Sequence, residues 1–362
     1  MKSIYIHIPF CKTICTYCDF CKLYHNKEWI DKYLVSLREE IESNYKGEVV
    51  ETIYIGGGTP SSLPVDSLME LFDIVKIFNY QNIEFSFECN IENINVELLE
   101  LLKNNGVNRL SIGVETFNPK YLKFMGRNYN KFDIINGIEL SKKYFNNISV
   151  DLMYAFPNQT LDELMDDIKE FKKLGIPHIS TYSLIIEPHT VIYNKVKNID
   201  PELDRNMYDL IIDELKDYNH YEVSNFGKDG YQSKHNLTYW NNDNYYGFGL
   251  GSGGYIDNVR YMNTRNIKEY INGNYRLDSD ILSDNEIVEN AFILGLRKID
   301  GINKDEFNSK YKLDINKIDI VNKLISENKL VDDGINIKIN NDLIYVSNSI
   351  LCDFIGVDYY GK

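Results

Sequence analysis

The chain has 362 residues, of which 43% are hydrophobic and 26% charged, and its formal charge is −15. This length allows one large domain with an appendage or two ordinary domains. The acidic balance argues against nucleic acid as a partner, because a basic face is needed to displace phosphate counterions. No run of about 18 apolar residues marks a membrane span, and the first residues lack the charged head and apolar core of a signal peptide. We therefore expect a globular protein of the cytoplasm.

Strand-like segments alternate with helix-like segments through the first half of the chain. The strands are expected at 3–8, 51–55, 83–88, 108–114, 148–154 and 178–184, and the helices at 29–43, 65–78, 95–105, 119–125, 131–145 and 160–175. This alternation implies parallel strands joined by right-handed crossovers. Six strands are too few for a closed eight-stranded barrel, so the sequence predicts an α/β fold with a partial, open (β/α)6 barrel. Chemistry in such a sheet gathers at the carboxyl ends of the strands.

The pattern changes after about residue 204. A helix is expected at 204–218 and a strand at 221–225, followed by a polar, Gly-rich stretch. We expect three parts: the barrel at 1–230, a connecting region at 231–280, and a small helical, winged-helix-like domain at 281–362. A winged helix often binds DNA, but the acidic charge disfavours that function here.

Four cysteines cluster near the start of the chain. Cys11, Cys15 and Cys18 form a C-x3-C-x2-C pattern in the loop after the first strand. In a reducing cytoplasm such thiols indicate metal or redox chemistry rather than disulfides. A zinc site would need a second Cys or His pair, and none is visible. A 4Fe–4S cluster takes thiolate ligands, and three of them leave one iron open to a ligand with an amine and a carboxylate. Cys21 could be a fourth ligand, a redox accessory or a small loop residue, and we favour the last.

Polar groups follow several of the later strands. The stretch "YIGGGTPSSL" comes after the second strand, and glycines there allow close backbone approach to a ligand. Glu88, Glu115 and Asp151 stand at successive strand ends, and Arg127 follows the fourth strand. A single such acid is usually a solvated or capping group, but a series at one edge of a sheet indicates a binding site.

These motifs carry a resemblance. The pattern C-x3-C-x-Y-C resembles the signature of the radical SAM superfamily, and "GGGTP" resembles its loop for the methionine amino group of S-adenosylmethionine (SAM). With "YIHIPFC", "RLSIGVETF", "DLMYAFPNQT", "YSLIIEPHT", "YEVSNF" and "HNLTYW", the match to the HemN/HemW group runs from residue 4 to about 297.

The resemblance implies a 4Fe–4S cluster on Cys11, Cys15 and Cys18, with SAM on the open iron. One electron from the reduced cluster would then cleave the sulfonium bond of SAM to give a 5′-deoxyadenosyl radical. The resemblance also implies a set of SAM contacts: Tyr5, Tyr17, Gly57, Gly58, Thr59, Glu88, Glu115, Arg127 and Asp151. It assigns no catalytic residue.

Three features favour the HemW branch of this group. Only ten residues precede the first cysteine, Phe20 stands where the oxidase has a Cys, and "HNLTYW" matches a motif associated with heme binding. The resemblance implies heme as a ligand, and His235 is the candidate ligand of the heme iron. The alternative is that His235 is an ordinary buried histidine with a structural hydrogen-bonding role. It further implies delivery of heme to acceptor hemoproteins of respiration, an electron donor such as flavodoxin or ferredoxin, and peripheral membrane contact only through the acceptors.

Two other functions stay open. One is a radical SAM enzyme proper, either an oxygen-independent coproporphyrinogen III dehydrogenase or a HemN-like methyltransferase. The other is a cluster-carrying binding module without SAM chemistry. The chain also departs from the group at Glu115 and Thr116, where Gln and Ser are usual, at Cys89 and Ile91, where "EANP" has Ala and Pro, and at Tyr129, where G-R-x-H has His. These departures bear on single SAM contacts rather than on the cluster.

Overall fold

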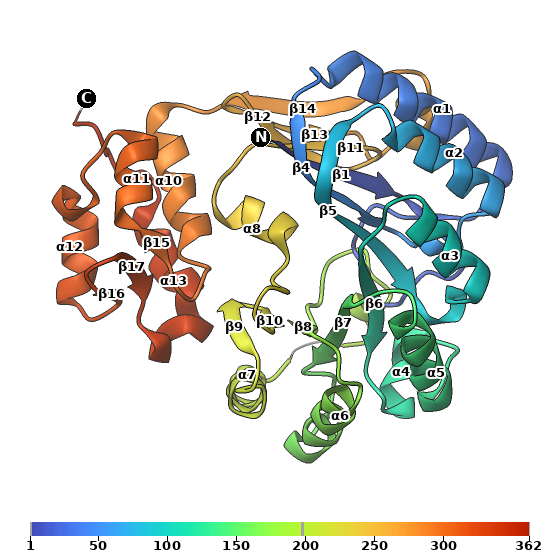
Figure 1. Ribbon diagram of the computed structural model, residues 1–362. Helices are drawn as coiled ribbons and strands as arrows, with labels where there is room; N and C mark the ends of the chain where they lie inside the picture. The colour runs from blue at the N-terminus through green and yellow to red at the C-terminus, as the bar shows by residue number, and fades with distance from the viewer. Residues whose placement is uncertain (1, 197–198, 362) are drawn as a thin grey trace.

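The computed structural model describes residues 2–196 and 199–361 and contains one 12-stranded sheet with helices on its outer side (Figure 1). The sheet order is β14-β13-β12-β11-β1-β4-β5-β6-β7-β8-β10-β9. Among the described residues, no helix is long and apolar enough to cross a membrane.

Six consecutive strands of this sheet are parallel and follow chain order. They are β1 (Lys2–Ile8), β4 (Val49–Gly57), β5 (Asn79–Asn90), β6 (Arg109–Glu115), β7 (Asn147–Tyr154) and β8 (His178–Ser183). Parallel strands covered by helices are buried on both faces, and β6 accordingly has six of its seven residues buried. The predicted partial (β/α)6 barrel is confirmed.

Helices follow these strands and pack against the outer face of the sheet (Figure 1). They are α1 (Lys27–Asn44), α2 (Val65–Val75), α3 (Val96–Asn104), α4 (Pro119–Met125), α5 (Lys131–Lys142), α6 (Leu161–Lys173) and α7 (Pro201–Glu214). Their starts follow local rules. Asn26 caps α1 through its side chain, and Thr160 forms a capping box with Glu163 at α6. Each helix therefore begins close behind the loop at a strand end.

The sheet continues beyond the six parallel strands at both edges. At one edge, β11 (Tyr245–Phe248) joins β1 in parallel, and three antiparallel strands follow it. These are β12 (Gly253–Ile256), β13 (Val259–Asn263) and β14 (Arg276–Ile281). At the other edge, β10 (Asn225–Gly227) and β9 (Asn219–Glu222) extend β8. The strands of 231–280 thus lie in the main sheet itself.

The C-terminal unit is mostly helical and has a small sheet of its own. It contains α10 (Asp284–Gly295), α11 (Lys304–Tyr311), α12 (Asp319–Ser326), α13 (Ser347–Leu351), β15 (Ile302–Asn303), β16 (Leu330–Asp332) and β17 (Asn336–Ile339). Its order of strands is β15-β17-β16. Phe292 stacks on Phe354 at 4.5 Å between ring centroids in the core of this unit. The predicted helical C-terminal part is therefore present.

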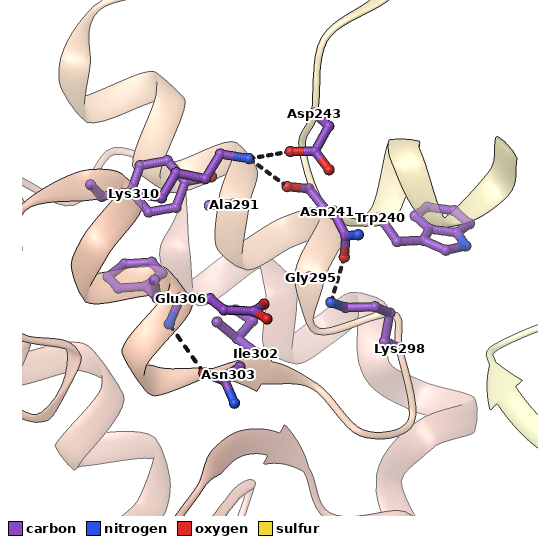
Figure 2. Close-up of a pocket in the computed structure, with 12 residues that line it drawn as sticks. Trp240, Asn241, Asp243, Ala291, Gly295, Lys298, Ile302, Asn303, Glu306 and Lys310 are labelled. Carbon is purple, nitrogen blue, oxygen red and sulfur yellow. Dashed lines mark hydrogen bonds and ion pairs between the residues drawn. The ribbon is translucent and has the colours of Figure 1, made fainter. Parts of the chain in front are cut away.

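The helix α8 (Lys234–Trp240) lies between the sheet and the C-terminal unit (Figure 1). Two lysines of that unit reach the end of α8 (Figure 2). Lys298 Nζ donates to Asn241 Oδ1 at 2.7 Å, and Lys310 Nζ donates to the Asn241 carbonyl at 3.0 Å and to Asp243 Oδ1 at 2.6 Å. A positive group on the last carbonyls of a helix is favourable. These bonds join α8 to the C-terminal unit. A cavity of about 130 Å³ lies beside them. A further short helix, α9 (Ile267–Ile271), lies between β13 and β14.

Candidate functional site

A cavity of about 490 Å³ opens at the carboxyl ends of the parallel strands. Its walls come from the cysteine loop, the glycine loop after β4 and the ends of β5 to β8. The predicted residues that line it are Cys11, Cys15, Cys18, Tyr17, Gly57, Gly58, Thr59, Glu88, Glu115, Arg127 and Asp151. Its volume lies in the range of roughly 300–1,000 Å³ that small-molecule sites occupy. The structure therefore brings all three expected cluster cysteines and eight of the nine expected SAM contacts into one site.

Backbone hydrogen bonds close the cysteine loop at its base. The short strands β2 (Phe10–Cys11) and β3 (Leu23–Tyr24) pair in parallel, with Leu23 N–H donating to the Pro9 carbonyl at 2.7 Å. At the other side of the loop, Thr16 N–H donates to the Met125 carbonyl at 3.2 Å. The loop that carries the thiols is thus tied to both β1 and the end of α4.

The three cysteine thiols fit a cluster better than a single ion. Within the described ranges, no three His, Cys, Asp or Glu side chains converge closely enough to hold one metal ion. A 4Fe–4S cubane does not require such convergence, because each thiolate binds a different iron. Burial raises the pKa of Cys11 and Cys18, and that of Cys15 to about 11, while Arg127 opposes the effect at each thiol. Metal binding would therefore release protons from this loop.

Cys21 is turned away from the cavity and packs against the loop between β11 and β12. A Cβ on Gly251 would lie 2.6 Å from the Cβ of Cys21 and 3.1 Å from its Sγ. Its carbonyl accepts a hydrogen bond from His7 Nε2 at 2.7 Å. The expectation that Cys21 is a loop residue agrees with this packing.

Two positions of the glycine loop require glycine, because a side chain at either would clash with neighbouring atoms. Gly57 has φ +114°, and a Cβ there would lie 2.6 Å from the His7 ring. A Cβ on Gly58 would lie 2.8 Å from the Pro9 backbone and 2.9 Å from Cys11 Sγ. Thr59 follows, and its hydroxyl donates to Cys11 Sγ at 3.5 Å. The loop therefore approaches the first cysteine as closely as backbone can.

Glu115 joins the cysteine loop to the strand ends. It lies at the end of β6 with φ +69°, where the pairing with β7 shifts register after Gly113. Such bulges re-aim a side chain next to a site. Its Oε1 accepts from the Tyr17 hydroxyl at 3.0 Å and from Arg127 at 2.6 Å. Tyr17 stands between Cys15 and Cys18, so this group fixes the position of the loop that carries both.

The cavity carries an excess of negative charge. Five carboxylates line it, from Asp19, Glu88, Glu115, Asp151 and Glu187, against two basic side chains, Lys22 and Arg127. Burial raises the pKa of Asp151 well above its usual value, and the neighbouring Glu115 and Glu88 raise it further. Burial also raises the pKa of Glu88. A ligand with a positive charge would relieve this repulsion, and the sulfonium of SAM, the ligand expected from the sequence, is such a charge.

Two predicted ligand residues lie elsewhere. Among the residues that the structure describes, Tyr5 is not part of the cavity lining. Its hydroxyl forms a hydrogen bond of 2.9 Å with His7 Nδ1. His235 lies on α8, which packs against β4, and is 1% exposed. Its Nδ1 lies 2.7 Å from the Thr52 hydroxyl and its Nε2 lies 2.7 Å from the Tyr239 hydroxyl. Burial lowers the pKa of His235 to about 3. Neither ring nitrogen faces an open surface.

Several residues of the cavity wall were not found from the sequence. Ser111 and Gly113 precede Glu115 at two-residue steps along β6, and Met153 follows Asp151 at the same step on β7. Side chains two residues apart share a face of a strand, so this alternation could have indicated them. Ile185 and Glu187 come from the loop after β8, inside the stretch "YSLIIEPHT", whose match to the HemN/HemW group did not single out either residue.

The open parallel sheet and the three cysteines at its mouth define a radical SAM protein, and the model of the radical SAM superfamily matches residues 5–182. The solved structure of coproporphyrinogen III oxidase (HemN) from Escherichia coli aligns with a TM-score of 0.85, covering 98% of this chain and 90% of that chain at 20% identity. At that identity the likeness shows a shared fold.

Sequence similarity extends beyond the superfamily region. "Heme chaperone HemW" from Lactococcus lactis is 39% identical and covers 98% of this chain and 97% of its own length. The protein of that name from Bacillus subtilis is 40% identical, covering 86% of this chain and 87% of its own. The one from Escherichia coli is 31% identical, covering 75% and 76%. The chain belongs to the HemW family.

Proposed function

We propose that this chain is a radical SAM heme chaperone, which binds heme and delivers it to acceptor hemoproteins. The observation that carries the proposal is the extent of the similarity to proteins named heme chaperone HemW, which covers 98% of the chain rather than residues 5–182 alone. A shared superfamily barrel would explain only the shorter match. The longer match includes α8 with its "HNLTYW" sequence and the C-terminal unit.

The cofactors of the proposal are a 4Fe–4S cluster on Cys11, Cys15 and Cys18, with SAM on the open iron, and heme. When bound, the cluster and SAM supply one-electron chemistry at the sulfonium. The acids of the cavity favour a cationic ligand, and Tyr17, Glu115 and Arg127 hold the cysteine loop in place. The glycine loop gives the ligand room next to Cys11.

The family resemblance seen in the sequence also suggests the partners of the protein and its location, and we include both in the proposal. Heme would pass to hemoproteins of respiration, with membrane contact only through them, and the cluster would be reduced by a flavodoxin or ferredoxin in the cytoplasm. Ligation of heme iron by His235 belongs to the same proposal. It would require α8 to move, because Thr52 and Tyr239 occupy both ring nitrogens.

The test is heme binding and transfer by the cluster-loaded protein. We would reconstitute the cluster anaerobically, titrate heme into wild type and into His235→Ala, and follow the Soret band. The proposal expects saturable binding of one heme per chain and transfer to an apo-hemoprotein, with Cys352→Ser, at an exposed thiol, as a control that changes neither.

Two outcomes would contradict the proposal. One is weak, unsaturable heme binding by wild type. The other is consumption of coproporphyrinogen III with formation of 5′-deoxyadenosine, which would identify a radical SAM enzyme proper. Weaker heme binding by His235→Ala, with SAM affinity and unfolding free energy unchanged, would place His235 at the heme.

A further inference from the structure

The imidazole of His235 is fully engaged inside the fold. The ring is 1% exposed and each nitrogen lies 2.7 Å from a hydroxyl, Thr52 on one side and Tyr239 on the other. A neutral imidazole has one N–H and one lone pair, so these two hydroxyls use its whole hydrogen-bonding capacity. The arrangement is that of a residue that holds its neighbours in place.

The segment that carries His235 is anchored to the sheet. Glu84 on β5 accepts from the backbone N–H of His235 at 3.0 Å and from that of Lys234 at 3.1 Å. Ser233 caps the same end of α8 by accepting from Asn236 N–H. Acceptors at a helix start satisfy donors that have no partner within the helix. The position of the His235 ring is therefore set by the sheet.

From His235 a chain of contacts leads to the glycine loop. The ring stacks on Tyr54 with 5.1 Å between centroids and 30° between planes. The Tyr54 hydroxyl donates to Glu88 Oε1 at 2.8 Å, and the Gly57 N–H donates to Glu88 Oε2 at 2.9 Å. Tyr54, Gly57 and Glu88 all line the cavity. His235 thus packs behind the wall of the cavity without reaching it.

A second chain of contacts leads from the same cluster to the cysteine loop. Tyr5 lies 6.5 Å from His235 and 6.1 Å from Tyr54 between ring centroids. The Cys21 carbonyl can only accept, so His7 Nε2 carries the proton and donates to it at 2.7 Å. His7 Nδ1 then accepts from the Tyr5 hydroxyl at 2.9 Å. Both loops of the cavity are supported by aromatic rings that touch His235.

We propose that His235 is a positioning residue of the cofactor site. Stacked on Tyr54 with 30° between the ring planes, it holds the Tyr54 hydroxyl on Glu88, and Glu88 in turn holds the Gly57 amide and the loop that receives SAM. This inference rests on the proposed function of the cavity as a SAM site. It gives "HNLTYW" a role in SAM binding, and the contacts of α8 with the C-terminal unit connect that unit to the same cluster.

The test compares two replacements of His235 with a matched histidine. His235→Phe keeps a flat ring on Tyr54, and His235→Leu does not. His178 is equally buried, with Nδ1 2.7 Å from Ser149 and Nε2 2.8 Å from Tyr221, so His178→Leu controls for loss of a buried, doubly bonded histidine. SAM affinity is measured by equilibrium titration of cluster-loaded protein, and hydrogen exchange of the Gly57 amide is measured in cluster-free protein.

We expect His235→Leu to weaken SAM binding about tenfold, as coupling between contacting residues allows. His235→Phe and His178→Leu should bind SAM like wild type. The Gly57 amide should exchange faster in His235→Leu and in Tyr54→Phe, but not in His178→Leu. In a Tyr54→Phe background, His235→Leu should cost little further SAM affinity, because the two act through one hydroxyl.

The inference fails if His235→Leu binds SAM like wild type, or if His178→Leu weakens SAM binding as much. Additive losses in the Tyr54→Phe background would also contradict it. A wild-type protein that carries its cluster but binds no SAM contradicts the proposed function of the cavity, and that result is distinct from unaltered binding by the variants.

Discussion

Glu115 and Arg127 form an ion pair of 2.6 Å in the cavity wall, and their side chains are only 7% and 8% exposed. Tyr17 donates to the same carboxylate oxygen, so the pair is bonded directly to the cysteine loop. The unusual backbone of Glu115 is what directs its carboxylate toward that loop.

Removing the cation of this pair should be costly. Arg127→Met leaves the Glu115 carboxylate buried without a partner, and breaking a buried pair in this way typically costs about 3–5 kcal/mol. We expect a drop of that order in the free energy of unfolding, measured by denaturant titration of the cluster-free protein. Glu115→Gln, which can still accept from Tyr17, should cost less. Equal and small losses for both variants would show that the pair contributes no net stability.

The close approach of the glycine loop to Cys11 leads to a second prediction. Gly58→Ala would place a Cβ 2.8 Å from the Pro9 backbone, which cannot move without shifting β1 and the cysteine loop. We expect cluster-loaded Gly58→Ala to hold less than half the iron of wild type, measured as iron and sulfide per chain. Gly253→Ala is the control, since its nearest atom would lie at an ordinary 3.6 Å. Full iron content in Gly58→Ala would contradict this prediction, because the glycine loop would then accommodate the added Cβ without loss of the cluster.

The elements of this fold were predictable where the pattern was local and periodic. Alternating strands and helices gave the six-stranded parallel sheet, and strand ends followed by acids located Glu88, Glu115 and Asp151 in the cavity. The edge strands β11 to β14 were not expected, because their polar, Gly-rich sequence lacks a clear period. The place of β11 beside β1 depends on long-range pairing, such as Ser3 with Tyr245.

The buried interactions that hold the site in place could not be predicted from the sequence either. Glu40 is fully buried on α1 and accepts from Gly249 N–H and Tyr270, which fixes the loop that packs on Cys21. An acid on a helix usually faces solvent, and no motif marks Glu40 as an exception. The motif drew attention to His235, but the sequence does not reveal that both nitrogens of its ring are hydrogen-bonded, one to Thr52 and one to Tyr239.

The buried histidines should make the protein sensitive to acid. Burial lowers the pKa of His7 and His220 to about 4 and that of His235 to about 3, and it lowers the pKa of His178 well below the usual value. Below about pH 6.5 the unfolded chain binds protons that these folded rings exclude, so the stability that the histidines contribute is complete above that pH and falls as the pH drops toward 4. Buried carboxyls with a raised pKa, such as Asp151 and Glu88, act in the opposite direction. Unfolding free energies from pH 7.5 to 5 measure this slope.

A single replacement tests the cause of that slope. His220 stacks on Phe226 at 4.3 Å between ring centroids and is not part of the cavity lining, and His220→Phe keeps a flat ring there. Each such histidine contributes at most about 1.4 kcal/mol per pH unit in the window between its folded and unfolded pKa. His220→Phe should therefore lose stability less steeply than wild type between pH 6 and 5. An unchanged slope would assign the acid sensitivity to other groups.

The packing of Cys21 separates its role from that of the other three cysteines of its loop. Its side chain meets Gly251, whereas Cys11, Cys15 and Cys18 line the cavity. Cys21→Ser should therefore keep the wild-type iron content after anaerobic reconstitution, while Cys15→Ser should lose most of it, because a cubane held by two thiolates is poorly retained. Both variants should stay folded by circular dichroism. If Cys21→Ser lost iron as Cys15→Ser does, Cys21 would be a ligand, and the loop would have to turn it toward the cavity and away from Gly251 when the cluster binds.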